Sequence, residues 1–389
     1  MKASVQSILY CITIYVSAVV ASRLNQEVLA VGTQFEGLKD IYVNDLSFLY
    51  LHKSLIDIES LSNSENGVSQ YLKKYLELAG FTVELQRIHD DYDERYNVYA
   101  YLGSTRNTKV LLTSHIDTVP PYIPYNIEGT KIYGRGSCDA KASVAAQVFA
   151  LLSLIHSGEV KEGDVSLLFV VGEEVSGVGM QQATELNAKW DVAIFGEPTE
   201  LKLGVGHKGI MVIELQAEGK ASHSGYPELG VSASEILIPV LNDLINLKFP
   251  VDELLGPNTL NVGKFEGGVA ANVVPGYAEA LVSVRIATDI KEVEEKVLQV
   301  IKDVPNLKYN IRSKSSAQHI DYDIPDFDTI VLAYGTDIPN LSVPVQKRYL
   351  YGPGSIHVAH SDHEFVENSD LLQAFKDYQK ITKYALQHI

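Results

Sequence analysis

Residues 109–117, KVLLTSHID, set the pattern for the first part of the chain. An apolar, β-branched run that a sheet would bury leads directly into polar residues. The same form recurs at residues 165–174, VSLLFVVGEE, and at residues 191–198, DVAIFGEP. Residues 140–158 lie between the first two runs and have the composition of a buried helix that ends at a glycine. Strands that alternate with helices predict an α/β fold, with a mostly parallel mixed sheet flanked by helices.

Residues 206–314 follow a different pattern, which predicts a separate domain inserted into the first. The predicted elements are a strand, a helix, two strands, a helix and a strand, at residues 209–219, 230–247, 258–268, 277–287, 289–304 and 307–313. This β-α-β-β-α-β order is the ferredoxin-like arrangement. We therefore expect the first domain to occupy residues 45–205 and to resume at residues 315–389.

The N-terminus has the pattern of a secretory signal peptide over residues 1–21. Its apolar stretch, residues 8–21, is shorter than the roughly 20 residues that span a bilayer, so we expect cleavage rather than a membrane anchor. The mature chain would then have no stable membrane span, and residues 22–44 would be a pro-segment or linker. The sequon at Asn340 adds a glycosylation site, and we expect a secreted or vacuolar protein.

Charge and cysteine content argue against a nucleic-acid-binding protein and against a core held together by disulfide bonds. The formal net charge is -17, which argues against nucleic acid as a partner, because phosphate binding needs basic patches. The chain has two cysteines, Cys11 and Cys138, and the first would leave with the signal peptide. The mature core would therefore hold together without an internal disulfide.

Acidic and imidazole side chains stand where the predicted strands end, at His115, Asp117, Glu173, Glu174 and Glu197, and the loop GRGSCDAK adds Asp139. Three histidines, His357, His360 and His363, follow near the C-terminus. Strand ends of a parallel sheet lie side by side, so these residues can converge. Imidazoles with several carboxylates are a zinc-type ligand set with room for two metal ions, whose charge would offset the repulsion among the acids. Taken alone, a Glu-Glu pair is more simply a solvated strand end, and spacing does not choose among the three histidines.

Six motifs in order carry a resemblance: SHIDTVP, GRGSCDAK, GEEVSGVGM, GEPT, ASHSGYP and GPGSIHVAHSDHEFV. Together they resemble the dizinc peptidase and deacylase family of glutamate carboxypeptidase, aminoacylase, acetylornithine deacetylase and succinyl-diaminopimelate desuccinylase. The style is closest to the secreted fungal carboxypeptidase-like members. Each motif is modest alone, but six in order are specific, and the resemblance covers nearly everything after residue 45.

The resemblance implies two zinc ions per subunit, with Co²⁺ or Mn²⁺ as substitutes, held by His115, Asp139, Glu174, Glu197 and His360. Asp139 would bridge the two ions. The first ion would also take His115 and Glu197, and the second would take the remaining two ligands. The family likeness further implies a cis peptide bond between Asp139 and Ala140.

The same resemblance implies roles for residues that are not metal ligands. Glu173 would be the general base, and Asp117 would orient the first histidine ligand through its other ring nitrogen. The inserted domain would be a lid that can also form a homodimer. Its His223 would polarise the scissile carbonyl, while Asn272 and Arg285 would contact the substrate, arginine being suited to a carboxylate.

The sequence departs from the family at Ala140, Ala142 and His363, where a bulkier or acidic residue, a glycine and an asparagine are common, but no ligand is lost. We expect a dizinc hydrolase of peptide or amide bonds, foremost a metallocarboxypeptidase that acts on short peptides. The alternative is a deacylase of N-acylated amino acids, which shares the machinery. A remoter alternative is a non-catalytic binding protein on the same fold.

Overall fold

The structure is a computed structural model that describes residues 43–90, 92 and 94–389. The predicted signal peptide, residues 1–21, and all but the end of the predicted pro-segment or linker, residues 22–44, lie outside the described residues. The chain falls into two compact units. The second unit comprises Leu203–Asp323 and Phe327–Pro339, and so continues past residue 314, where we placed the end of the inserted domain.

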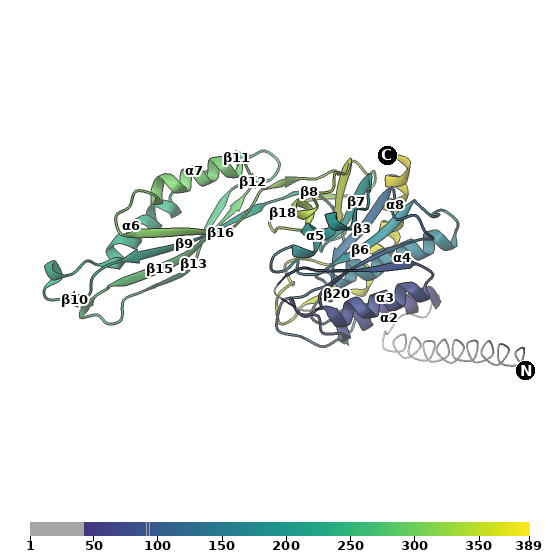
Figure 1. Cartoon of the computed structure of the whole chain (residues 1–389), viewed down its shortest axis with the longest axis horizontal. Helices are drawn as coiled ribbons and strands as arrows, with labels where there is room; N and C mark the ends of the chain where they lie inside the picture. The colour runs from purple at the N-terminus through teal and green to yellow at the C-terminus, as the bar shows by residue number, and fades with distance from the viewer. Residues whose placement is uncertain (1–42, 91, 93) are drawn as a thin grey trace, which may run out of the picture. The chain divides into compact units, whose positions relative to one another are not determined.

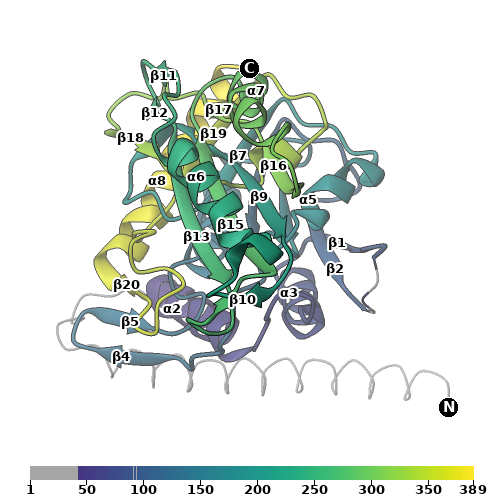
Figure 2. The same cartoon turned by 90° about the vertical axis from the view of Figure 1, so that its left-hand side faces the viewer.

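The first unit is built on a mixed sheet with the strand order β1-β2-β6-β3-β7-β19. These strands are Thr82–Arg87, Tyr96–Tyr101, Val165–Val170, Val110–His115, Val192–Gly196 and Lys347–Tyr351. Figure 1 labels β6, β3 and β7 of this sheet, and Figure 2 labels β1, β2 and β19. The strands β6, β3, β7 and β19 pair in parallel, and β1 and β2 add an antiparallel edge. The register aligns His115 with Val170 and Ser114 with Gly196, so the carboxyl ends of β3, β6 and β7 meet at one edge of the sheet. This edge is where ligands bind in open parallel sheets.

Helices flank this sheet because both of its faces are apolar. The longer helices are α2, α3, α4 and α8, at Val43–Asp57, Asn66–Leu78, Lys141–His156 and Asn368–Gln387. Helix α4 packs against α2, α8 and β3. It is apolar on nearly all sides, and it is buried almost throughout its length. The strand β3 is buried at every residue, which explains the uninterrupted apolar run in its sequence.

Short elements complete the first unit. The strands β4, β5 and β20, at Asn126–Glu128, Lys131–Tyr133 and Phe365–Glu367, form an antiparallel sheet in the order β20-β5-β4. Helix α5 spans Val178–Gln182, and the 3-10 helix η1 spans Ala183–Leu186. A further 3-10 helix, η3 at Ile338–Asn340, lies where the chain passes from the second unit back to the first. The pairing of β20 with β5 brings the segment after residue 360 beside the segment before residue 139.

The second unit has the β-α-β-β-α-β order that the sequence predicts. Its sheet has the order β13-β15-β9-β16, with every pair antiparallel. These strands are Thr259–Gly267, Tyr277–Ile286, Gly209–Glu218 and Leu307–Ser315, and the helices α6 and α7 are Ala233–Ile245 and Ile290–Ile301. Both helices pack on one face of the sheet (Figures 1 and 2), and their apolar side chains and the inward residues of the strands form one core. Ser232 and Asp289 cap α6 and α7 with their side-chain oxygens.

A smaller sheet in the second unit, with the order β17-β8-β18, holds a buried histidine. Its strands are Gln318–His319, Leu203–His207 and Thr329–Leu332. The Nδ1 of His207 donates to the carbonyl of Lys208 at 3.1 Å, and its Nε2 accepts from the hydroxyl of Thr336 at 3.0 Å. Burial lowers the pKa of His207 to about 4, so this imidazole is neutral at physiological pH.

The remaining short elements are the strand pairs β10–β14 and β11–β12 and the 3-10 helix η2, at Ser222–His223, Val273–Val274, Val251–Asp252, Gly256–Pro257 and Pro227–Leu229.

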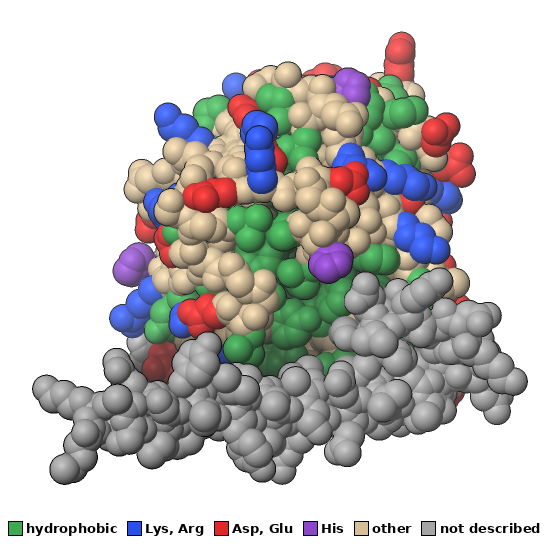
Figure 3. Space-filling view, turned by 90° about the vertical axis from the view of Figure 1, so that its right-hand side faces the viewer, with side chains coloured by type: hydrophobic (Ala, Val, Ile, Leu, Met, Phe, Trp, Pro, Cys, Tyr) green, Lys and Arg blue, Asp and Glu red, His purple; other side chains and the backbone are tan. Residues whose placement is uncertain are grey.

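One face of the molecule carries a hydrophobic area bordered by charged side chains of both signs (Figure 3). Across residues 43–90, 92 and 94–389, no helix has both the length and the apolarity to cross a membrane.

Candidate metal centre

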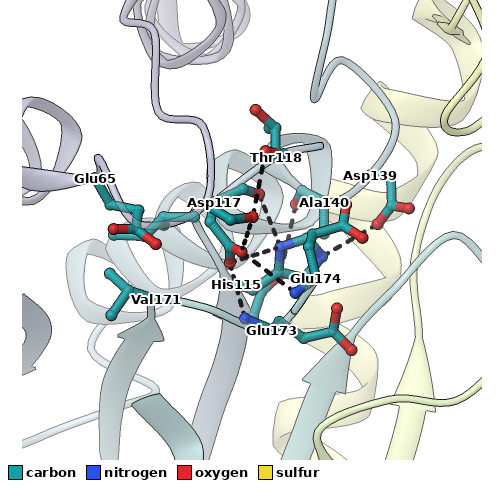
Figure 4. A network of polar contacts seen from close by, with 12 residues as sticks. Glu65, His115, Asp117, Thr118, Asp139, Ala140, Val171, Glu173 and Glu174 are labelled. Atoms are coloured by element: carbon teal, nitrogen blue, oxygen red, sulfur yellow. Dashed lines mark hydrogen bonds and ion pairs between the residues drawn. The ribbon is translucent and has the colours of Figure 1, made fainter. Parts of the chain in front are cut away.

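Three neighbouring strands deliver most of the predicted site residues to one edge of the main sheet. His115 is the last residue of β3, Glu173 and Glu174 follow β6, and Glu197 follows β7. Asp139 stands just before α4, in a loop that we define as the Asp139 loop, residues 134–139. Figure 4 shows His115, Asp139, Glu173 and Glu174 gathered at the strand ends. His360 joins this group from the segment between β19 and β20, which we call the His360 segment, residues 352–364.

The two carboxylate oxygens of Asp139 face different imidazoles. Its Oδ1 lies 3.1 Å from Nε2 of His115, and its Oδ2 lies 3.3 Å from Nε2 of His360. On the first side, Nε2 of His115 is also 3.9 Å from Oε2 of Glu197. On the second side, Nε2 of His360 is 2.9 Å from Oε2 of Glu174. Asp139 therefore lies between two groups of possible metal ligands, each made of one imidazole and one further carboxylate.

This donor set fits divalent metal ions. Ligand atoms of His115, Asp139 and Glu174 all lie within 4.8 Å of one another, and imidazole with carboxylate is the combination that zinc prefers at catalytic sites. Because the acids outnumber the bases, the site attracts positive charge. Hydrogen bonds to Asp139 and Glu174 raise the pKa of His360 to about 10. Metal ions would supply that positive charge in place of protons on the imidazoles.

The electrostatics at His115 follow the same logic. Burial alone would lower its pKa, but the carboxylates of Glu197, Asp117 and Asp139 raise it well above the usual value. For Asp139, burial favours the neutral acid, yet the hydrogen bonds with both imidazoles lower its pKa. For Glu174, burial and the charge of Asp139 prevail, and its pKa is raised. The repulsion expected among crowded acids is thus present, and cations relieve it.

Asp117 forms hydrogen bonds both with His115 and with the loop that carries Glu173 and Glu174. The Nδ1 of His115 donates to the backbone carbonyl of Asp117 at 3.0 Å, which leaves Nε2 free to bind a metal. The carboxylate of Asp117 accepts the amides of Glu173 and Glu174 at 3.0 and 3.3 Å, and the hydroxyl of Ser62 at 2.8 Å. The sequence predicts the contact between Asp117 and His115, but it does not predict the hydrogen bonds from the amides of Glu173 and Glu174 to the Asp117 carboxylate.

The adjacent acids Glu173 and Glu174 differ in their surroundings. Glu174 approaches His360, whereas the charge of Glu173 acts on His115 from further away. Figure 4 shows the two side chains leaving the loop separately. Glu174 is therefore placed where it could bind a metal ion together with His360, and Glu173 is left to act on another group.

Asn97 is a further residue that the sequence analysis missed. It lies in β2 with no exposed surface. Its Oδ1 accepts the amide of Val171 at 3.1 Å, and its Nδ2 donates to the carbonyl of Gly179 at 2.8 Å. One side chain therefore fastens both ends of the loop that carries Glu173 and Glu174. The available signal was a polar residue inside an apolar strand, because a buried amide needs specific partners.

Between those ends, Gly172 allows a turn that other residues would not. Its φ is +75°, and a Cβ there would lie 2.6 Å from Nη2 of the buried Arg95. Arg95 forms a buried ion pair with Glu65, with 2.7 Å between Nη2 and Oε1. A rigid charged pair thus lies directly beneath the loop.

The structure distinguishes the three C-terminal histidines. Of these, His360 contacts the site carboxylates, whereas His363 is exposed and pairs with Asp362 at 2.8 Å. His357 is exposed, and its amide donates to the hydroxyl of Ser355. The Asp139–Ala140 peptide bond is cis, as the resemblance implies.

The predicted lid residues belong to the second unit. His223 lies in β10 and pairs with Val273 of β14, and the backbone carbonyl of Asn272 accepts the amide of Ser224 at 3.0 Å. Arg285 lies in β15, and burial lowers its pKa. Asn340 is the last residue of η3 and belongs to the first unit, where its Oδ1 accepts from Gln181 at 3.4 Å. Their predicted roles, glycosylation included, stay predictions.

Comparison with known proteins identifies the family. Residues 111–384 match the model of peptidase family M20/M25/M40. A peptidase M20 domain-containing protein of Schizosaccharomyces pombe is 50% identical, over 99% of both chains. A probable carboxypeptidase of Aspergillus oryzae is 41% identical, over 96% of this chain and 98% of the relative.

Among solved structures, a tripeptidase from Staphylococcus aureus superposes with a TM-score of 0.75 at 21% identity, over 88% of this chain and 99% of that one. At this identity the likeness is one of fold, and the mixed α/β architecture agrees with it. The chain therefore belongs to peptidase family M20/M25/M40, and it is a metallopeptidase-type hydrolase.

Proposed function

We propose that the chain is a secreted or vacuolar dizinc metallocarboxypeptidase that acts on short peptides. The observation that carries the two-metal part is Asp139, whose oxygens face His115 and His360 separately. The similarity to a probable carboxypeptidase supports the choice of substrate. The signal-like residues 1–21 support passage through the secretory pathway.

The ligands of the proposed ions would be His115, Asp139, Glu174, Glu197 and His360. Two divalent cations bound there would polarise the scissile carbonyl and lower the pKa of a water molecule toward ~7. Glu173 would act as the general base. Glu173 would take a proton from the water molecule while the water oxygen adds to the carbonyl carbon. It would then deliver that proton to the leaving nitrogen as the C–N bond breaks. Such proton transfer contributes about 10²–10⁴-fold to the rate.

Residues of the second unit would complete the reaction in this proposal. His223 would donate a hydrogen bond to the oxyanion, a role typically worth about 3–4 kcal/mol. Arg285 would bind the terminal carboxylate of the peptide, because a guanidinium matches that group in shape and charge, and Asn272 would contact the substrate beside it. The second unit would also be the surface through which a homodimer forms.

A deacylase of N-acyl amino acids is the second candidate, because it would use the same carboxylates and metal ions. A non-catalytic binding protein is disfavoured, since all five ligand positions and the base are occupied by competent side chains.

Metal analysis and a small substrate set test the proposal together. Mass spectrometry of the purified protein should find two zinc ions per chain. An N-blocked dipeptide with a free C-terminus should be hydrolysed, its C-terminal amide should resist, and an N-acetyl amino acid should react more slowly. Faster hydrolysis of the N-acetyl amino acid would favour the deacylase, and a protein free of metal would contradict the proposal as a whole.

A further inference from the structure

Glu364 is a buried carboxylate that the predicted mechanism leaves unused. It is 1% exposed and stands four residues after His360. Its Oε1 accepts three backbone amides of the Asp139 loop, those of Gly136, Cys138 and Asp139, at 3.0, 3.1 and 3.1 Å. Its Oε2 accepts Nη1 of Arg135 at 2.7 Å. Both oxygens of one side chain are therefore bound by the same loop.

Convergent amides and a guanidinium make this part of the loop an anion-binding concavity. Each hydrogen bond to a carboxylate is stronger than one to a neutral acceptor. Burying a charge pair is expensive unless the remaining donors and acceptors are satisfied, and here the four contacts satisfy them. The loop is thus shaped around the carboxylate, and a side chain without that charge would not fill the same place equally well.

The contact joins two ligand-bearing stretches that are far apart in the sequence. The backbone carbonyl of Glu364 accepts the amide of Gly134 at 3.2 Å, and the next residues pair β20 with β5. The His360 segment and the Asp139 loop therefore run together. Within this arrangement, Nε2 of His360 lies 3.3 Å from Oδ2 of Asp139.

The Asp139 loop has a second support, independent of Glu364. The Nε2 of His52 in α2 donates to the carbonyl of Ser137 at 2.9 Å. The Nζ of Lys141 donates to the carbonyls of Leu55 and Ile58 at 2.7 and 3.1 Å, which fastens the start of α4 to the end of α2. Because of this support, loss of the Glu364 contact is expected to shift the loop rather than unfold it.

We propose that Glu364 is a positioning residue of the metal centre. By binding the Asp139 loop from the His360 segment, it holds the carboxylate of Asp139 and the imidazole of His360 close together, with 3.3 Å between Oδ2 and Nε2, where both could bind a metal ion. Side chains that orient metal ligands typically contribute 10–100-fold to metal affinity. This inference rests on the proposed two-metal function, and its test separates the two ideas.

The test compares Glu364→Gln with Glu367→Gln. The first variant keeps the size of the side chain but turns an amide NH₂ toward Arg135 or toward the three loop amides. The control changes a partly exposed glutamate three residues later, whose Oε2 accepts from Thr130 at 2.7 Å. Metal-free protein of each variant is titrated with zinc by calorimetry, and the folded state is checked by circular dichroism. We expect zinc affinity to fall 10–100-fold in Glu364→Gln and to stay within about threefold of wild type in the control.

Cobalt absorption supplies a second readout that does not depend on activity. At saturating Co²⁺, the visible spectrum of Glu364→Gln should differ from wild type, because the ligand geometry has moved, while the control spectrum should overlay it. If Glu364→Gln fails to fold, Glu364→Asp is measured with the same expectation. It keeps the charge but withdraws the oxygens by one methylene group.

The outcomes separate cleanly. Wild-type protein that takes up no zinc overturns the proposed function. Wild-type protein that binds two zinc ions, together with a Glu364→Gln variant of unchanged affinity and unchanged cobalt spectrum, overturns only the positioning role. A variant that melts at a lower temperature but binds zinc like wild type shows a merely structural contact, and it overturns the positioning role too.

Discussion

Replacement of Asn97 by alanine should destabilise the first unit through two identifiable groups. In the native structure its side chain satisfies the amide of Val171 and the carbonyl of Gly179, and Asn97 has no exposed surface. Alanine leaves both backbone groups buried without that partner. Each such group costs about 1–3 kcal/mol, so we expect the free energy of unfolding to fall by about 2–6 kcal/mol. This is a large part of the ~5–15 kcal/mol that typically stabilises a folded protein.

Urea unfolding followed by tryptophan fluorescence measures this effect in the relevant unit. The chain has a single tryptophan, Trp190, which is buried in the first unit. Hydrogen exchange at Val171 should speed up in parallel, because the amide loses its acceptor. Asn66→Ala is the matched control, since the Asn66 amide makes an exposed contact with Glu94. An Asn97→Ala variant no less stable than this control would refute the reasoning that Asn97 fastens the loop.

Two other predictions concern the acidic pair and the pH dependence of stability. Glu173→Gln should retain metal while kcat falls about 10²–10⁴-fold, whereas Glu174→Gln should lose metal affinity; mass spectrometry that finds equal metal loss in both would contradict this division. Burial lowers the pKa of His207 from the usual 6.5 to about 4 in the folded chain, so the unfolded chain binds the proton first as the pH falls. Stability should therefore decrease from pH 6.5 to pH 4, by about 3 kcal/mol for this group. The denaturant midpoint of the second unit, followed across that range by hydrogen exchange, checks the decrease, and His207→Gln should flatten it.

The sequence predicts the parts of the fold and of the site that depend on local pattern. The apolar runs before His115, Glu173 and Glu197 predict buried parallel strands, and such strands must end at a common edge. The family resemblance, not the spacing, selected His360 among three histidines, and the structure brings that one to Asp139. The Asp139–Ala140 cis bond also came from the resemblance and is confirmed.

The supporting residues could not be predicted in the same way. Asn97 lies in an apolar strand and Glu364 in a polar stretch, and neither has a local pattern that names its partners. Their roles come from groups that approach only in the folded chain, 74 residues away for the bond from Val171 to Asn97 and 225 residues away for the bond from Asp139 to Glu364. Hydrogen-bond partners at such separations are set by the three-dimensional arrangement. A sequence pattern can mark a buried polar residue as unusual, but not its partners.

The arrival of His360 and β19 late in the chain has a consequence for synthesis on the ribosome. Glu197 and β7 are made 163 residues before His360, and the second unit is translated in between. At ~5–20 residues per second, this interval lasts about 8–33 s. During that time β7 lacks the strand that will pair with its outer edge, and α4 lacks α8. Until β19 and α8 are synthesised, the nascent first unit therefore exposes the unpaired edge of β7 and the apolar surface of α4. Such surfaces are the ones that chaperones bind and that aggregate when left unattended.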